Sequence, residues 1–485
     1  MSDSSKPVTN DINQIMNLKI FGGERPARRS RPTRTYTEPA REIPVLAETD
    51  VLVVGGGPAG TAAAIAAARV GGEVMLVERY NHLGGLSTGG LVIWIDRMSD
   101  WSGRPVIRGL ADELMDRLPK DAIQGPPKAD WGSRDAATAA YWAERTAAFH
   151  GTVTWSPTID PELLKTLSMQ MVLDHKVRLL LHAWVAAPIV EDGQVRGAVI
   201  ESKEGRHAIH AKVVVDTTGD ADLIARAGAA CLSDIDQTDI HHCINTAWLF
   251  GGVDMEQWIR FRTERPQDFA DFMQRGREKL KAFERPFVSW RNDVCVFMGP
   301  RLSGYSAIDV EDQTEVEIRS RQLMMGSLDY FRAQAPGFAN AFIMLGAPQL
   351  GVRHSRRMEG VRSVTRQQWD TGTVWDDEIG VSTSLSPKFP NISVPYGALV
   401  PAKLDGILGA GRHVACDASS HSFLREIPQC WLTGQAAGVA AALAAGASVR
   451  PRDVEVRRIQ RALKRQGAYL SPSIEAALDG RLVAE

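Results

Sequence analysis

The stretch that most constrains the fold is residues 50–60, DVLVVGGGPAG, where an apolar run meets a cluster of glycines. A continuous apolar run is typical of a strand buried on both faces of a parallel sheet. The following segments read as a helix of small residues, TAAAIAAARV, and a second strand, EVMLVE. Strand, glycine turn, helix and strand in this order predict an α/β fold with a Rossmann-type nucleotide-binding domain.

The glycines of this turn satisfy the G-x-G-x-x-G spacing of dinucleotide-binding proteins. The first permits a tight turn, the second lets the backbone approach a pyrophosphate, and the third lets the helix pack on the strand. The residues predicted to hold the dinucleotide here are Gly55, Gly57, Pro58, Ala59 and Gly60. Glu78, followed by Arg79, ends the second strand, and its carboxylate can accept hydrogen bonds from both ribose hydroxyls.

A second glycine-rich loop, LGGLSTGGL at residues 83–91, closely follows the second strand. A plain NAD dehydrogenase needs no such loop, whereas the ribitol and isoalloxazine of FAD extend beyond the pyrophosphate and need close backbone approach. No second complete G-x-G-x-x-G occurs, so we expect no separate NAD(P)H domain. The loop therefore predicts FAD as the cofactor.

Composition excludes several other classes of protein. A chain of 485 residues with 44% hydrophobic residues can bury the cores of two domains, three at most. The net charge of −2 gives no general attraction to nucleic acid or anionic membrane, and we expect neither as a partner. The five cysteines include no C-x-x-C pair, which excludes an iron–sulfur or structural zinc framework. With no recognisable secretory signal, we expect a cytoplasmic enzyme acting on a small molecule.

The sequence pattern predicts a discontinuous FAD-binding domain with a second domain inserted into it. The predicted divisions are an extended N-terminal arm at 1–47, an N-terminal portion of the FAD-binding domain at 48–230, an α+β substrate domain at 231–395, and a C-terminal portion of the FAD-binding domain with the last helices at 396–485. The arm carries proline-spaced arginines, which favour a surface strap or a subunit contact over nucleic-acid binding. We therefore expect a homo-oligomer.

Several local features lie within the N-terminal portion of the FAD-binding domain. Residues 95–157 hold Trp and Tyr amid Pro, Gly and Asp, and read as an insertion. It is either a lid or substrate wall, or a surface helical excursion with its own small core. Residues 160–173 predict a helix capped by Asp160, followed by a strand VRLLLHAWV. Asp192-Gly193 and Glu204-Gly205 suit the turns of a small antiparallel β-meander.

These and later segments resemble the bacterial FAD-dependent oxidoreductases of glutathione-reductase-like fold, related to fumarate reductase and L-aspartate oxidase flavoproteins. The matching segments are VLVVGGGPAGTAAAIAAA with Glu78, LGGLSTGGL, VVVDTTGDADLIARAG, LGVRHSRRMEG, VPYGALVPAKLDGILGAGRHVA and LREIPQCWLTGQAAGVAAALA. They span most of residues 50–450. The resemblance implies an FAD-binding fold and redox chemistry.

The resemblance also implies further cofactor contacts along the chain. The residues that would line the ribitol and flavin are Gly84, Gly85, Ser87 and Thr88, and the backbone of Val185 would meet the adenine. Those that would pass near the pyrophosphate are Thr218, Gly219 and Asp220, with Gly411 and Arg412 on its other side. Those that would open the last helix, whose N-terminus points at the flavin in this fold, are Gly434, Gln435 and Ala436.

Candidate catalytic residues come from three segments. In LGVRHSRRMEG, three arginines stand at i, i+3, i+4 spacing, which on a helix gives one face that could converge on an anion. His354 stands where related sequences carry Glu, and His413 where they often carry Cys. Arg425 matches a family position near the flavin edge and could hold a carboxylate. The predicted catalytic set is Arg353, His354, Arg357, His413 and Arg425.

Hydride transfer between FAD and a small polar organic substrate, which could be anionic, is the function that fits these residues best. The alternative is an FAD-dependent monooxygenase that hydroxylates an aromatic or heteroaromatic ring with NAD(P)H, although such enzymes typically carry Gly-Asp-Ala where this chain has Gly411-Arg412-His413. An electron-transfer subunit would need clustered cysteines, and a tRNA-modification or scaffold protein would need a basic patch. No metal site is predicted, because His241-His242 have no carboxylate or cysteine at ligand spacing.

Overall fold

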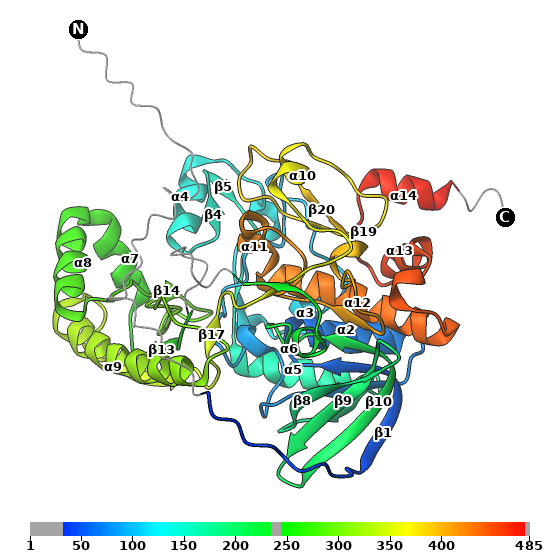
Figure 1. Cartoon of the computed structure of the whole chain (residues 1–485). Coiled ribbons are helices and arrows are strands. Elements are labelled where there is room, and N and C mark those ends of the chain that lie inside the picture. Colours follow the sequence, from blue (N-terminus) through cyan, green and yellow to red (C-terminus); the bar gives the residue numbers. More distant parts are fainter. Residues whose placement is uncertain (1–32, 234–243, 481–485) are drawn as a thin grey trace.

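The computed structural model describes residues 33–233 and 244–480, and a seven-stranded sheet forms its centre (Figure 1). The strand order is β7-β2-β1-β10-β9-β8, and β21 also pairs with β10. The strands are β1 (Val45–Val54), β2 (Val74–Val77), β7 (Arg178–Leu180), β8 (Trp184–Glu191), β9 (Gln194–Ser202), β10 (Gly205–Asp216) and β21 (Ile407–Gly409). The predicted α/β fold with a parallel sheet and an antiparallel meander is confirmed.

Strand β10 joins the two types of pairing in this sheet. Its first half, from Gly205 to His210, runs antiparallel to β9 in the meander. Its second half, from Val214 to Asp216, runs parallel to β21, while β1 pairs in parallel along its other edge. Because β21 comes from residues 407–409, the sheet is completed by a late segment of the chain.

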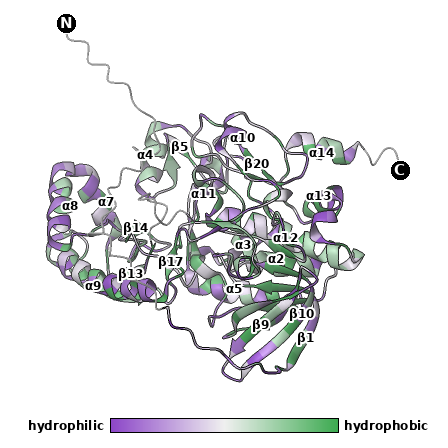
Figure 2. Cartoon of the chain, in the orientation of Figure 1, coloured by the Kyte–Doolittle hydropathy of each residue, from purple (hydrophilic) through white to green (hydrophobic). Residues whose placement is uncertain are grey.

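Two helices of small residues cover the parallel strands. They are α2 (Pro58–Arg69) and α12 (Ile427–Ala447), and they lie side by side. A Cβ added at Gly438 would lie 2.1 Å from the carbonyl oxygen of Ala63, so the two backbones are in direct contact. Helix α12 is long and apolar enough to cross a membrane, but 83% of its most apolar window is buried inside the protein. Figure 2 shows the hydrophobic strands and helices gathered at this centre.

A lobe built around four antiparallel strands lies to one side of the main sheet (Figure 1). Its elements are β13 (Trp248–Gly251), β14 (Phe287–Val288), β15 (Val294–Phe297), β16 (Phe342–Gly346), α7 (Met255–Glu264), α8 (Pro266–Leu280) and α9 (Val310–Gln334). One face of this sheet carries an aromatic core that includes Trp258 and Phe331. Leu249 and Val296 point the other way into the main core, so the lobe is continuous with the rest of the protein.

The segment 95–157 is divided between two cores. Ile107 and Leu114, the latter on α3 (Leu110–Arg117), belong to the main core. Trp142, on α4 (Ala136–Glu144), packs with Val153 in a small separate cluster. The first part of the segment therefore packs into the main core, whereas α4 belongs to a helical region with its own small core.

Two predictions about the strands and helices near residue 180 had different outcomes. Helix α5 (Pro161–Asp174) is confirmed with its cap, because the Asp160 carboxylate accepts hydrogen bonds from the backbone N–H groups of Glu162 and Leu163. The single strand predicted over VRLLLHAWV is wrong. His182 has φ +58°, and this left-handed residue breaks the segment into β7 and β8, which lie at opposite edges of the sheet.

The shorter elements complete the described chain. They are β3 (Ile123–Gln124), β4 (Ala148–Phe149), β5 (Thr152–Val153), β6 (Thr158–Ile159), α6 (Asp222–Arg226), β11 (Cys231–Leu232), β12 (Ile244–Asn245), β17 (Gly351–Val352), β18 (Arg357–Met358), α10 (Arg366–Asp370), β19 (Glu378–Ser382), β20 (Ile392–Pro395), α11 (Ala418–Leu424), α13 (Val456–Arg465) and α14 (Pro472–Asp479). Of the predicted arm, residues 33–44 have no helix or strand, and residues 1–32 lie outside the described ranges.

Candidate functional site

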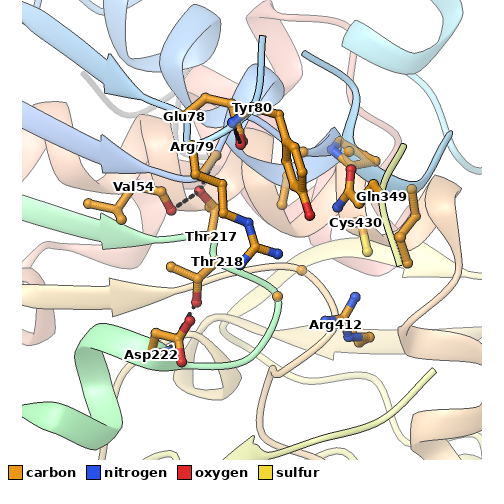
Figure 3. A pocket seen from close by; sticks show the side chains of 18 of the residues that line it. Val54, Glu78, Arg79, Tyr80, Thr217, Thr218, Asp222, Gln349, Arg412 and Cys430 are labelled. Atoms are coloured by element: carbon orange, nitrogen blue, oxygen red, sulfur yellow. Dashed lines mark hydrogen bonds between the residues drawn. The ribbon is translucent and has the colours of Figure 1, made fainter. Parts of the chain in front are cut away.

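A cleft opens at the carboxyl ends of the parallel strands. Its empty volume is about 860 Å³, including space open to solvent. Gly55 follows β1, Glu78 follows β2, Thr217 follows β10 and Gly411 follows β21, and all four line it. Ligands of open α/β sheets bind in this position. Figure 3 shows side chains from these separate segments arranged around the cavity.

The three fingerprint glycines have different surroundings. Gly55 has φ +103°, and a Cβ there would lie 2.6 Å from the carbonyl oxygen of Thr217. A Cβ at Gly60 would lie 1.7 Å from the carbonyl oxygen of Gly55, so this glycine is required for the turn itself. At Gly57 the nearest atom to such a Cβ is the Cα of Gly85, 3.9 Å away. The second glycine is therefore not needed by the protein, and it leaves a backbone open to the cleft.

Glu78 and Arg79 are fixed at one end of the cleft. The Glu78 carboxylate accepts hydrogen bonds from the backbone N–H groups of Gly56, at 2.6 Å, and Tyr80, at 2.8 Å. The Arg79 guanidinium lies 4.9 Å from the ring centre of Tyr80 and 4.8 Å from that of Trp184. Because Trp184 is 48% exposed, this end forms a cationic and aromatic platform at the mouth of the cleft.

The middle of the cleft offers positive charge and free backbone donors. Gly57 is the N-cap of α2 and supplies no side chain, and since Pro58 has no N–H, the backbone N–H groups of Ala59 and Gly60 are those without an intrahelical partner at this helix end. Arg412 donates from Nη2 to Asp220 at 2.6 Å, and its side chain is 11% exposed. Its Nε is buried and has no hydrogen-bond partner within the described residues. This combination suits a bound phosphate group.

Gln349 and Cys430 lie away from Glu78 in Figure 3, and Gly85, Leu86, Arg425 and Ile427 also line the cleft. Arg425 Nη2 lies 3.0 Å from a carboxylate oxygen of Glu426, and its buried Nε lacks a partner within the residues described. Burial raises the pKa of the nearby Cys430 thiol to about 12. Cys430 is therefore a neutral thiol at ordinary pH and is unsuited to thiolate chemistry.

More than half of the predicted cofactor residues line the cleft. They are Gly55, Gly57, Pro58, Ala59, Glu78, Arg79, Gly85, Val185, Thr218, Gly219, Gly411 and Arg412. Of the predicted catalytic residues, Arg425 lines it as well. These residues come from segments far apart in the sequence and meet in one cavity.

Other predicted cofactor residues shape the loops behind the cleft wall. Ser87 donates through its hydroxyl to the carbonyl of Gly84, and Thr88 does so to the carbonyl of Leu83. Gly84 has φ +92°, and a Cβ there would meet the Thr88 side chain at 2.4 Å. Neither Gly60 nor Asp220 lines the cleft. The Asp220 carboxylate accepts a hydrogen bond from Arg412 instead.

The prediction that Gly434, Gln435 and Ala436 open the last helix is wrong. Helix α12 begins at Ile427, with Glu426 as its N-cap and Pro428 in its first turn. Gly434 lies further along the helix, where an added Cβ would be 2.1 Å from the carbonyl oxygen of Ala59. The three residues therefore pack α12 against neighbouring elements, and Ile427 and Cys430 line the cleft in their place.

The expected helical face at residues 353–357 is also wrong, because this segment bends between two short strands, β17 and β18. His354 is buried, with its ring centre 4.7 Å from that of His421, and Arg357 is buried too. Neither they nor Arg353 and His413 line the cleft. Four of the five catalytic candidates therefore do not contribute to the lining of this cleft.

His413 is fully buried, and neither ring nitrogen has a hydrogen-bond partner among the residues that the structure describes. Burial lowers its pKa below the ordinary value of 6.5, against the opposing influence of Asp216, so the folded state holds it neutral. As pH falls below 6.5, the unfolded chain takes up a proton that the folded chain does not, and stability is lost.

We therefore expect His413→Leu to flatten the decline of the melting temperature between pH 7 and pH 5. Thermal unfolding at each pH measures this slope, and His207→Leu, at a half-buried position on β10, is the control. An unchanged slope for His413→Leu would contradict the neutral, buried assignment.

Several lining residues were missed by sequence reasoning. They are Val54, Val77, Tyr80, Leu86, Ala183, Trp184, Thr217, Asp222, Gln349, Ile427 and Cys430. Most are immediate neighbours of predicted residues, so the residues that border each motif could have been predicted to line the site as well. Gln349 immediately precedes the motif LGVRHSRRMEG, and a hydrogen bond of 3.2 Å from its backbone N–H to the carbonyl of Gly89 links this segment to the glycine loop. His241-His242 lie outside the described residues.

A glycine turn on a parallel sheet, an acid after the second strand and a cationic cleft define a dinucleotide-binding α/β protein. The model of the FAD dependent oxidoreductase family matches residues 50–463, and the chain belongs to this family. It is an FAD-dependent oxidoreductase, and FAD is its cofactor.

Two curated relatives are flavoproteins that match shorter stretches. Digeranylgeranylglycerophospholipid reductase 2 of Methanopyrus kandleri is 27% identical over 218 residues, covering 43% of this chain and 46% of the relative. The tRNA uridine 5-carboxymethylaminomethyl modification enzyme MnmG of Geobacter metallireducens is 32% identical over 170 residues, covering 35% of this chain and 24% of the relative. The matches span less than half of the length of either relative.

Among solved structures, a geranylgeranyl bacteriochlorophyll reductase-like protein from Thermoplasma acidophilum is 14% identical, with a TM-score of 0.42 over 86% of this chain and 82% of its own. The p-nitrophenol 4-monooxygenase of Pseudomonas putida is 11% identical, with a TM-score of 0.42 over 90% and 93%. These likenesses are too distant to assign an activity.

Proposed function

We propose that the chain transfers a hydride between FAD and a small polar substrate that carries an anionic group. FAD would occupy the cleft along its whole length. Glu78 would hold the AMP ribose, the N-terminus of α2 and Arg412 the pyrophosphate, and the wall that includes Gln349 and Cys430 the flavin. Two features support this fit: the open backbone at Gly57 and the unpartnered buried Nε atoms of Arg412 and Arg425.

The substrate proposal rests on Arg425, a cationic side chain that lines the cleft. Its guanidinium is held on one side by Glu426 and retains donors that a carboxylate could accept from. When bound, FAD supplies the ring that accepts or donates the hydride. Arg425 would orient the substrate, and the N-terminus of α12 would favour negative charge at its end of the cleft.

The position of the aromatic residues in segment 95–157 does not favour the ring-hydroxylating alternative. The aromatic residues of segment 95–157 suit a ring-shaped substrate, but none of them lines the cleft. Trp131 and Trp155 instead stack on each other, with ring centres 4.8 Å apart.

The test is anaerobic reduction of the purified yellow protein, followed at the visible flavin band. We expect a panel of small carboxylic and hydroxy acids to include a compound that bleaches it, and NADH and NADPH to leave it unchanged. Arg425→Leu should retain the yellow colour and slow bleaching by that acid at least about ten-fold, since a charge-assisted hydrogen bond is lost. Arg117→Leu, in an ion pair on α3, is the control.

Rapid bleaching by a nicotinamide would instead place the monooxygenase or a nicotinamide-driven reductase first. Bleaching by the acid that Arg425→Leu leaves unaltered would contradict the role given to Arg425.

A further inference from the structure

A buried set of polar contacts ties Arg412 to the segment 353–358. The Ser355 hydroxyl and the Arg412 guanidinium both donate to the same carboxylate oxygen, Oδ1 of Asp220. Ser355 is 7% exposed and Asp220 is 9% exposed, and neither lines the cleft. Through this shared contact, Arg412 connects the two residues to the cleft.

A second tie runs in parallel with the first. Arg356 donates from Nη1 to the backbone carbonyl of Asp220 at 2.9 Å and to the carboxylate of Asp222 at 3.1 Å. Asp222 lines the cleft, so the loop that follows β10 is fixed through both its backbone and its side chains. The segment 353–358 thus sets the shape of a cleft wall to which it contributes no lining residue.

The charges in this set agree with such a role. Burial acts to raise the pKa of Asp220, but Arg412 and the Ser355 hydroxyl outweigh it and hold the pKa below its ordinary value. The carboxylate is therefore ionised at neutral pH and pairs with one edge of the guanidinium. Gly219 has φ +82°, and a Cβ there would lie 2.9 Å from Arg412 Nη2, so the absence of a side chain makes room for the guanidinium.

We propose that Ser355 and Asp220 are positioning residues that orient Arg412 toward the pyrophosphate of FAD and so set the affinity for this cofactor. The proposal rests on FAD occupying the cleft as described above. A purely structural ion pair would leave no donor facing a ligand, whereas Arg412 lines the cleft with its Nε unpartnered within the described residues. These contacts could not be predicted from the sequence, because Ser355 and Asp220 are 135 residues apart.

The experiment compares the dissociation constants of FAD and riboflavin, which lacks the pyrophosphate, for the full chain and for variants at Ser355, Arg412 and Asp220. We expect Ser355→Ala to weaken FAD binding about five-fold, because one hydrogen bond to a charged group is lost. Ser355→Thr, which keeps the hydroxyl, should restore the affinity. Riboflavin binding should be unchanged in both. In the background of Arg412→Met, Ser355→Ala should cause no further loss.

A different set of outcomes would overturn the proposal. They are an unchanged FAD affinity in Ser355→Ala, an equal loss for FAD and riboflavin, or a loss that persists in the Arg412→Met background. Asp220→Asn provides a second variant at the same oxygen and should weaken FAD binding more than Ser355→Ala does. FAD binding by the unaltered chain tests the proposed function, and the comparison among variants tests the positioning role, so the two can fail separately.

Discussion

Gly57→Ala is expected to abolish tight FAD binding while leaving the cofactor-free fold intact. The backbone at Gly57 has φ −67° and ψ −172°, which any residue can adopt, and a new Cβ would find no protein atom closer than 3.9 Å. The added methyl group would instead stand where the pyrophosphate must approach the backbone. We expect a loss of affinity on the order of 100-fold or more, which corresponds to about 2.7 kcal/mol.

Two measurements separate the components of this prediction. Equilibrium binding of FAD gives the affinity, and thermal unfolding without FAD should differ from that of the unaltered chain by no more than about 1 kcal/mol, the usual scale of an N-cap substitution. Gly60→Ala provides the contrast, because its Cβ would lie 1.7 Å from the Gly55 carbonyl oxygen and the apoprotein itself should be destabilised. Full FAD affinity in Gly57→Ala would mean that the cofactor does not approach this turn.

Gly438→Ala is expected to destabilise the whole protein although it lies away from the cleft. The added Cβ would fall 2.1 Å from the carbonyl oxygen of Ala63 on α2, and both helices are buried. Because neither backbone has room to move, we expect a cost of about 3 kcal/mol, at the upper end of ordinary overpacking. Chemical denaturation followed by circular dichroism measures this change.

The same helix offers a matched control for this substitution. A Cβ at Gly446 would meet nothing within 4 Å, and alanine is the better helix former. Gly446→Ala should therefore leave stability unchanged or raise it slightly. Equal stability of the two variants would show that α2 and α12 do not approach as closely as described.

The sequence predicted those elements of the fold whose residues act locally. The turn at Gly55–Gly60 and the hairpins after Asp192 follow from backbone conformations that few residues allow, and short-range patterns record them. The start of α12 also had a local signal, since Pro428 in its first turn is favoured there and excluded from helix interiors, but the later run of glycine and alanine concealed it.

The rest of the site could not be predicted from spacing. Arg353, Arg356 and Arg357 have helical periodicity, yet their segment bends between the short strands β17 and β18, which pair with β12 and β11, far away in sequence. Tertiary pairing of this kind overrides local propensity. The contact of Arg412 with Asp220 joins residues 192 positions apart, and only the folded sheet brings them together.

Because β21 and α12 lie near the C-terminal end of the sequence, the site cannot be completed until the ribosome has synthesised them. The turn after β1 and the acid after β2 are synthesised early, but β10 lacks a parallel neighbour on one edge, and α2 its cover, until residues 407–447 have been made. At roughly 5–20 residues per second, the interval is tens of seconds. A nascent chain in that interval lacks the five cleft residues Gly411, Arg412, Arg425, Ile427 and Cys430, so we expect tight binding of FAD only after translation of this last segment.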